Sequence, residues 1–159
     1  MSGVATTSRE TAGLANEAWE SLLTAHTRLI KELAAGEIWD DLSMREYDVL
    51  YTLSKCAAPI RLGELERHVL LSQPALSRMV DRLVRRGLVY RQADPTDARG
   101  RLLSLSSKGL AAQRRVGRRH ARSVARAMTR GLTRSELHDL RHLCDKLVGE
   151  TPITRGESR

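Results

Sequence analysis

The sequence has no phenylalanine, and aromatic residues make up only 3% of its 159 residues. A core must therefore consist mainly of aliphatic side chains, for which a hydrophobic content of 41% is sufficient. No apolar run approaches the roughly 18 residues that a membrane-spanning helix needs. The opening residues, MSGVATTSRE, lack the charged-then-apolar pattern of a secretion signal. We therefore expect a cytoplasmic protein without a membrane partner.

Residues that carry catalytic or redox chemistry are also scarce. The two cysteines, Cys56 and Cys144, do not make a disulfide framework. The five histidines are scattered, and the sequence has no glycine-rich phosphate loop, nucleophile elbow or metal signature. It therefore predicts neither an enzyme nor a protein with a resident cofactor or metal.

Charge is abundant, and it is unevenly placed. The formal net charge is +8, and residues 61–130 contain 17 Lys or Arg against 5 Asp or Glu. The remaining residues contain 10 Lys or Arg against 14 Asp or Glu. Such a basic segment favours a polyanionic partner, and nucleic acid is the most common one. Charge alone leaves open a merely soluble basic surface.

Residues 61–86 carry two short helical patterns. In the first, Leu62, Leu65 and Val69 recur at three- and four-residue steps and share one face. Ser72 can cap the second helix, and Pro74 lies in its first turn, where a missing N–H is tolerated. The apolar stripe of this second helix comprises Leu76, Met79, Val80, Leu83 and Val84. Gly87 is expected to end it.

A β-hairpin is predicted directly after these helices. Residues 88–92 and 101–105 alternate between apolar and polar side chains, as strands do. A loop rich in Asp, Pro and Gly lies between them and includes Asp97, Arg99 and Arg101. Residues 60–62 can pair with these strands. Two helices followed by a hairpin are the order of a winged helix-turn-helix, which places one helix in the DNA major groove.

The flanking segments predict four further helices, so the fold class is mainly α with a small β-wing. Capping-box patterns begin at Thr7, Ser43 and Thr133, and Ser106 or Ser107 can cap the helix after the wing. We expect a disordered N-terminus at 1–8, a winged helix-turn-helix DNA-binding domain at 42–106 and a flexible tail at 150–159. The apolar stripes of 9–38 and 107–149 have no evident partner within the small domain, which favours N- and C-terminal dimerisation helices.

The stretch GLVYRQADPTDARGRLLSLSSKG, residues 87–109, resembles the wing of the multiple antibiotic resistance regulator (MarR) family. Residues that fit the family's Asp-x-Arg-Gly signature and the following helix start are Asp97, Arg99, Gly100, Leu105, Ser106, Lys108 and Gly109. Residues 42–53 are similar to the family's second helix, whereas Glu66 stands where the family usually has a small residue. The resemblance implies a homodimeric transcription regulator, a repressor on an inverted-repeat operator.

DNA contacts are expected from the helix at 72–86 and from the wing. Gln73 can bond bidentately to adenine and Arg78 to guanine, while Arg82 is better suited to a phosphate. The candidates on the helix are Ser72, Gln73, Ala75, Ser77, Arg78 and Arg82. In the wing, Arg99 and Arg101 can reach the minor groove. The resemblance implies that Asp97 orients Arg99.

The resemblance also implies a small aromatic or anionic effector, bound in a crevice between the dimerisation helices and the winged helix. Candidate pocket residues are His26, Ile30, Trp39, Met44, Tyr47 and Tyr51. We expect most of them to be core residues instead, because a Tyr or Met on a helical stripe is usually buried. The effector is therefore a hypothesis.

Several alternatives remain beside this interpretation. A winged helix can bind DNA without sequence preference, as an architectural protein does. For Cys56 and Cys144, a buried and inert thiol is a better-supported interpretation than redox sensing. The pair His138 and His142 lacks further ligands for a metal. A row of like charge, formed by Arg114, Arg118, Arg122 and Arg126, either meets acidic residues across a dimer or lines an anion site.

Overall fold

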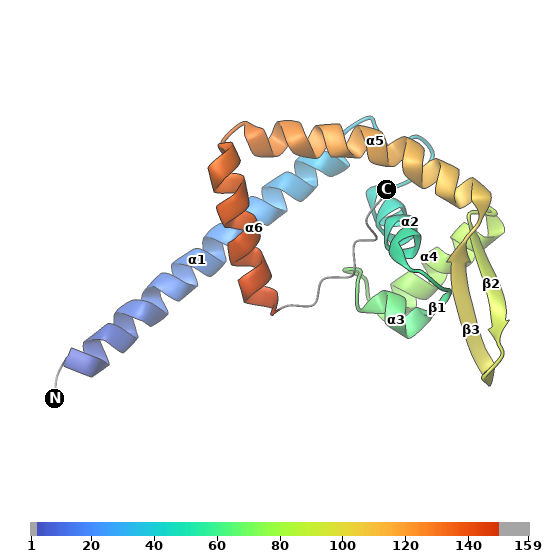
Figure 1. Cartoon of the computed structure of the whole chain (residues 1–159), viewed down its shortest axis with the longest axis horizontal. Coiled ribbons are helices and arrows are strands. Elements are labelled where there is room, and N and C mark those ends of the chain that lie inside the picture. The colour runs from blue at the N-terminus through green and yellow to red at the C-terminus, as the bar shows by residue number, and fades with distance from the viewer. Residues whose placement is uncertain (1–2, 150–159) are drawn as a thin grey trace. The chain divides into compact units, whose positions relative to one another are not determined.

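A computed structural model describes residues 3–149, with the backbone alone at 3–8 and 98–99. The chain divides into two compact units, residues 1–36 and 37–159. Figure 1 shows the helices and strands in chain order.

Helix α1, Gly3–Ala34, makes up the described part of the first unit except for the turn residues 35–36. It begins at Gly3, before the predicted cap at Thr7, and the disorder expected at residues 1–8 stays a prediction. No proline interrupts this stretch, and each residue added to an existing helix gains a backbone hydrogen bond. No side chain is buried within residues 9–34, and the exposed apolar ones include Leu14, Trp19, Leu22, Leu23 and Ile30. The apolar side of α1 therefore has no partner within its own unit.

The second unit begins with helices and strands in the predicted winged-helix order. Helix α2 is Met44–Lys55, α3 is Leu62–Glu66 and α4 is Gln73–Arg85. The strands are β1 (Ile60–Arg61), β2 (Val89–Asp94) and β3 (Asp97–Leu105), and they form an antiparallel sheet in the order β1-β3-β2. Ile60 pairs with Leu103, which confirms the predicted pairing of this segment with the wing.

Two helices follow the wing: α5, Ser107–Thr129, and α6, Arg134–Val148. Helix α5 packs against α2 and β3, whereas α6 buries none of its residues. Exposed apolar side chains on α6 include Leu143, Leu147 and Val148. No helix in the described part of the chain is long and apolar enough to cross a membrane.

The core of the second unit is aliphatic, as the lack of phenylalanine predicts. Its fully buried side chains are Val49, Leu50, Leu65, Leu76, Val80, Leu83, Val89, Leu103 and Val116. They come from α2, α3, α4, α5 and the sheet, so one cluster holds all of these elements together. Burying each such side chain contributes about 1.5–3 kcal/mol.

Side-chain caps fix the starts of three helices in this unit. The predicted capping boxes Ser43–Glu46 and Thr133–Glu136 are both formed, and Ser106 Oγ accepts a hydrogen bond from the Gly109 amide at 2.9 Å. Ser72 occupies the N-cap of α4, but its side chain makes no capping hydrogen bond. The predicted capping role of the Ser72 hydroxyl is therefore wrong, and the hydroxyl is exposed instead.

The wing has longer strands and a shorter turn than expected. Only Pro95 and Thr96 separate β2 from β3, so Asp97 and Arg99 belong to a strand and not to a loop. The Asp94 carboxylate closes this turn by accepting hydrogen bonds from the Thr96 amide and hydroxyl at 2.8 and 2.7 Å. A Cβ on Gly100 would lie 2.9 Å from the Asp94 Cβ, so this approach requires glycine.

Candidate nucleic-acid interface

The predicted contact residues of α4 lie on the face opposite its buried stripe. Ser72, Gln73 and Arg78 are exposed, and Ala75 and Ser77 are half-buried. The other face is occupied by Leu76, Met79, Val80 and Leu83, all buried. Arg78 forms no ion pair within the described residues. The N-terminal half of α4 thus presents hydrogen-bonding groups on a rigid, packed helix.

Arg82 is held by a carboxylate that sequence reasoning missed. Its Nε donates to Glu46 Oε1 at 2.9 Å, and Arg86 Nη1 donates to the same oxygen at 3.2 Å. The Glu46 side chain is only 6% exposed. Burial opposes its ionisation, but the Ser43 amide, Arg82 and Arg86 outweigh that effect, so the pKa of Glu46 lies below its ordinary value. Glu46, on α2, therefore holds α4 against α2 through this pair of arginines.

The segment before α2 continues this network toward α5. Arg86 Nη2 donates to the carbonyl and the carboxylate of Asp41 at 2.8 and 2.6 Å. The neighbouring Asp40 accepts hydrogen bonds from Arg119 and Arg115 on α5. These two arginines lower the pKa of Asp40 to about 2. Asp40 has a positive φ of 55°, which is uncommon outside glycine and lets adjacent carboxylates face different helices.

In the wing, a buried carboxylate organises the tip. Asp94 Oδ2 accepts hydrogen bonds from Arg61 on β1, at 2.8 Å to Nε and 2.5 Å to Nη2. Arg61 Nη1 also lies 3.8 Å from the Asp97 carboxylate. Asp97 thus approaches Arg61, and its expected pairing with Arg99 lies outside the described residues because the side chain of Arg99 is not described.

The register of β2 and β3 shifts at the wing tip. Ala93 pairs with Arg101, whereas Asp94 pairs with Asp97, so residues 98–100 form a bulge in β3. Arg99 lies within this bulge. Arg101 is exposed, and its Nη1 donates to the Gly100 carbonyl at 2.8 Å. Bulges change the direction of the side chains that they carry and bend the strand. The regular pairing of β2 and β3 therefore ends at the tip.

We expect Asp94→Asn to flatten the acid side of the stability curve. Hydrogen bonds from the Thr96 hydroxyl and amide, then from Arg61, lower the pKa of Asp94 to about 2 from an ordinary value of 3.8. The stabilisation is present above pH 4 and is lost as the pH falls toward 2. Melting temperatures at pH 7, 4, 3 and 2 should show a shallower decline for the variant. A parallel decline in both proteins would contradict this role.

Two of the predicted effector residues of the second unit, Trp39 and Tyr47, belong to an aromatic cluster in the core. Trp39 and Tyr47 are 7% and 5% exposed, and their ring centroids lie 5.7 Å apart. His120 on α5 lies 5.2 Å from each ring. Its Nδ1 is buried without a hydrogen-bond partner among the described residues, and burial lowers the pKa of His120. His120 is a member of this cluster that the sequence did not reveal.

The other candidate pocket residues are more open. Met44 is half-buried, and Tyr51 is 41% exposed and stacked on Tyr47 at 5.8 Å. His26 and Ile30 are exposed on α1, in the other unit. The effector pocket as a whole therefore stays a prediction.

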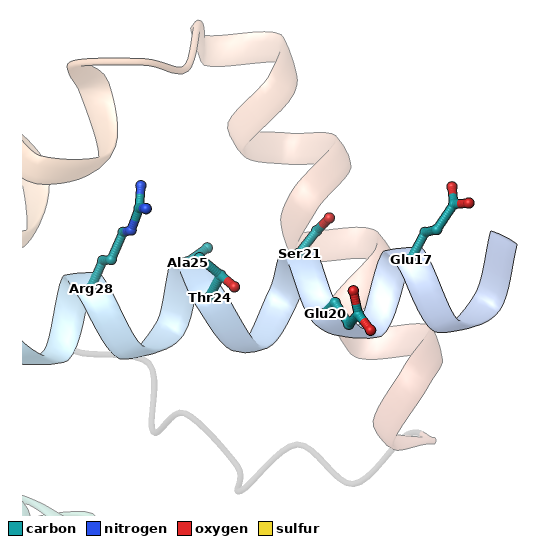
Figure 2. A pocket seen from close by; sticks show the side chains of 6 residues that line it. All are labelled: Glu17, Glu20, Ser21, Thr24, Ala25 and Arg28. Carbon is teal, nitrogen blue, oxygen red and sulfur yellow. The ribbon is translucent and has the colours of Figure 1, made fainter. Parts of the chain in front are cut away.

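One surface hollow belongs to α1 alone. Figure 2 shows its lining side chains along a single helix, with the basic end separated from the acidic end. They are Glu17, Glu20, Ser21, Thr24, Ala25 and Arg28. Because neither His26 nor Ile30 lines it, this polar hollow is not the predicted effector pocket.

Redox and metal chemistry gain no support from the geometry. Burial and the nearby Glu64 raise the pKa of the Cys56 thiol, which disfavours the reactive thiolate. Its Sγ lies 3.4 Å from the Thr52 carbonyl. Among the described residues, no group of three or more His, Cys, Asp or Glu side chains could hold a metal ion.

The chain is similar to known proteins of one family. Residues 42–100 match the model of the MarR family. The multiple antibiotic resistance protein MarR of Salmonella typhimurium is 31% identical over 108 residues, which are 68% of this chain and 74% of that protein. The corresponding protein of Escherichia coli K12 is 39% identical over 71 residues, 45% of this chain and 49% of that protein.

Solved structures agree with this match. A mutant E. coli MarR complexed with operator DNA has a TM-score of 0.70 and 28% identity, covering 82% of this chain and 92% of that chain. The PcaV transcriptional regulator from Streptomyces coelicolor, in complex with its natural ligand, has a TM-score of 0.63 and 27% identity, covering 84% and 90%. Both likenesses extend well beyond the winged helix.

Proposed function

Because the chain belongs to the MarR family of transcriptional regulators, we propose that it is a homodimeric repressor released by a small-molecule effector. Its target is duplex DNA with an inverted-repeat operator, and its place of action is the cytoplasm. The observation that carries this proposal is the exposed polar face of α4, held rigid by the buried Leu76, Val80 and Leu83 beside a wing.

Recognition would proceed through the N-terminal half of α4. Gln73 and Arg78 extend from its exposed face toward base edges, and the amides of its first turn favour a phosphate. In the wing, Arg99 and Arg101 supply charge for the backbone or the minor groove. Two-fold symmetry would place two copies of α4 about one DNA turn apart, which requires an inverted repeat.

Dimerisation is supported by apolar surface that the single chain leaves open. Trp19 on α1 and Leu147 on α6 are 60% and 73% exposed. Such side chains at helical spacing are typical of helices that pack against another chain. The E. coli MarR structure with operator DNA supports the DNA partner by likeness.

The effector proposal rests on the aromatic cluster and on one relative. PcaV was solved with its natural ligand, and in this chain Tyr51 exposes part of its ring beside the buried Tyr47. We infer a small aromatic or anionic effector whose binding changes the spacing of the two α4 helices. Thermal-shift and operator-release assays with a panel of aromatic acids test this part, and no hit in either assay would oppose it.

Gln73→Ala and Arg78→Ala should change sequence preference, whereas Arg99→Ala should weaken binding to all duplexes nearly equally. A bidentate base contact discriminates by about 1–3 kcal/mol, while a phosphate contact carries no base information. Competition gel shifts with the promoter beside its own gene and a scrambled duplex measure both effects. Arg134→Ala on α6 is the matched control. Unchanged binding in all three variants would exclude this docking, and equal affinity for both duplexes would indicate an architectural protein.

A further inference from the structure

Four arginines on α5 form what we call the arginine row: Arg114, Arg118, Arg122 and Arg126. All four are exposed. Residues 107–130 contain eight Lys or Arg and no Asp or Glu, while the net charge of the whole chain is +8. The rest of the chain therefore carries 19 residues of each sign, so the excess charge lies on α5 and its C-cap residue Arg130.

Ion pairing on α5 is selective. Arg115 and Arg119, on the neighbouring side of the helix, are both paired with Asp40. The arginine row has no ion pair within the described residues, and Arg126 contacts only the Ser123 hydroxyl, at 3.4 Å. Like charges at i and i+4 destabilise a helix. A bound anion would remove this repulsion.

The first two members of the arginine row, Arg114 and Arg118, face away from the winged helix. Val116 is fully buried in the core of the unit, and Arg114 and Arg118 lie two residues to either side of it. At about 100° per residue, these two side chains project from the opposite side of α5, whereas Arg122 and Arg126 are turned to about 120° and 80° from Val116. A duplex held by α4 and the wing is therefore not the partner that Arg114 and Arg118 meet.

The charges of the chain itself favour an external partner over a second copy. Helix α1 has four acidic and three basic residues, and α6 has three of each, so neither offers an excess of carboxylates. Duplex DNA carries one charge per about 1.7 Å. Arg114 and Arg126 are twelve residue steps apart, or about 18 Å of helix, so the arginine row presents four guanidiniums to several successive phosphates.

We propose that the arginine row binds the phosphate backbone of a second segment of duplex DNA, separate from the operator held by α4. This inference rests on the proposed function, because it assigns the first duplex to α4. A protein with both surfaces would bridge two DNA segments.

A two-duplex capture assay tests the proposal. The protein is loaded on an immobilised operator duplex, and retention of a labelled, unrelated duplex is measured at 50–200 mM salt. The variant R114Q/R118Q/R122Q/R126Q should lose at least about tenfold in retention, and the salt slope should fall by about 0.9 log unit for each phosphate contact removed. Operator affinity should change by less than about threefold. The matched control R9Q/R28Q/R134Q/R141Q removes the same charge from α1 and α6.

Each outcome decides one point. Loss of retention in the row variant, with retention in the control and in the corresponding four-lysine variant, supports the proposal. Equal retention by wild type and row variant, or no retention by wild type, overturns it while operator binding stands. A row variant that changes only self-association, measured by sedimentation, assigns the arginine row to a second copy and also overturns it. Loss of operator binding by wild type would refute the proposed function instead.

Discussion

Gly109→Ala is expected to lower the melting temperature by about 10 °C. A Cβ at this position would lie 2.0 Å from the Leu88 carbonyl oxygen and 2.9 Å from its carbon. Overpacking typically costs about 1–3 kcal/mol, and we expect about 3 kcal/mol or more here because a backbone carbonyl cannot rotate away. For a chain of this size, 1 kcal/mol corresponds to about 2–4 °C.

The surrounding hydrogen bonds explain why this contact cannot relax. Ser106 donates its amide to the Leu88 carbonyl at 3.1 Å and its hydroxyl to the Gly87 carbonyl at 2.7 Å. The Gly109 amide in turn donates to the Ser106 hydroxyl. The start of α5 is thereby fastened to the chain leaving α4, so a shift at Gly109 would break the cap as well.

Thermal denaturation followed by circular dichroism measures the effect. Gly63→Ala is the matched control, because Gly63 lies in helix α3 and a Cβ there meets nothing within 4 Å. Alanine is the better helix former by about 1 kcal/mol, so this control should keep or raise the melting temperature. Equal melting temperatures for Gly109→Ala and wild type would show that the close approach is absent in solution.

The winged-helix order was predictable because it depends on local patterns. The stripe of Leu76, Val80 and Leu83 has helical period, and the capping boxes at Ser43 and Thr133 need only four residues each. The Ile60 pairing followed from the position of a short strand before the first helix of the motif. The fold class therefore follows from spacing alone.

The contacts that fix the candidate interface join residues far apart in the chain. Arg82 and Glu46 are 36 positions apart, and Arg115 and Asp40 are 75 apart. An exposed arginine that faces DNA and an arginine that pairs with a buried carboxylate both fall on the polar side of a helix in the sequence pattern. Hydrophobic periodicity therefore does not distinguish them. At the wing tip, the contact between Arg61 and Asp94 also joins residues far apart in the chain, 33 positions from each other.

Glu46→Gln is expected to lower the free energy of unfolding by about 2 kcal/mol. Breaking a buried ion pair costs about 3–5 kcal/mol, but the side chains of Arg82 and Arg86 are 48% and 27% exposed, so water compensates part of the loss. Glutamine still serves in a capping box. Urea denaturation of the variant and wild type measures the difference.

Glu136→Gln separates the ion pair from the cap. Glu136 closes the capping box of α6 through the Thr133 amide, as Glu46 does for α2 through the Ser43 amide. Glu136 has no arginine partner in the described ion pairs. This control should change stability by less than about 0.5 kcal/mol, as surface substitutions usually do. An equal loss in both variants would mean that Arg82 and Arg86 contribute nothing through Glu46.

The Glu46→Gln variant also tests whether Arg82 can bind DNA once its carboxylate partner is removed. Glu46 neutralises Arg82 in the free protein, and without that carboxylate the guanidinium can turn to a phosphate. We then expect tighter binding to scrambled duplex and a salt slope steeper by about 0.9 log unit, with sequence preference unchanged because phosphates carry no base information. The double variant Glu46→Gln/Arg82→Ala should return the slope to the wild-type value. If the slope does not change in Glu46→Gln, removal of the carboxylate does not release Arg82 to a phosphate.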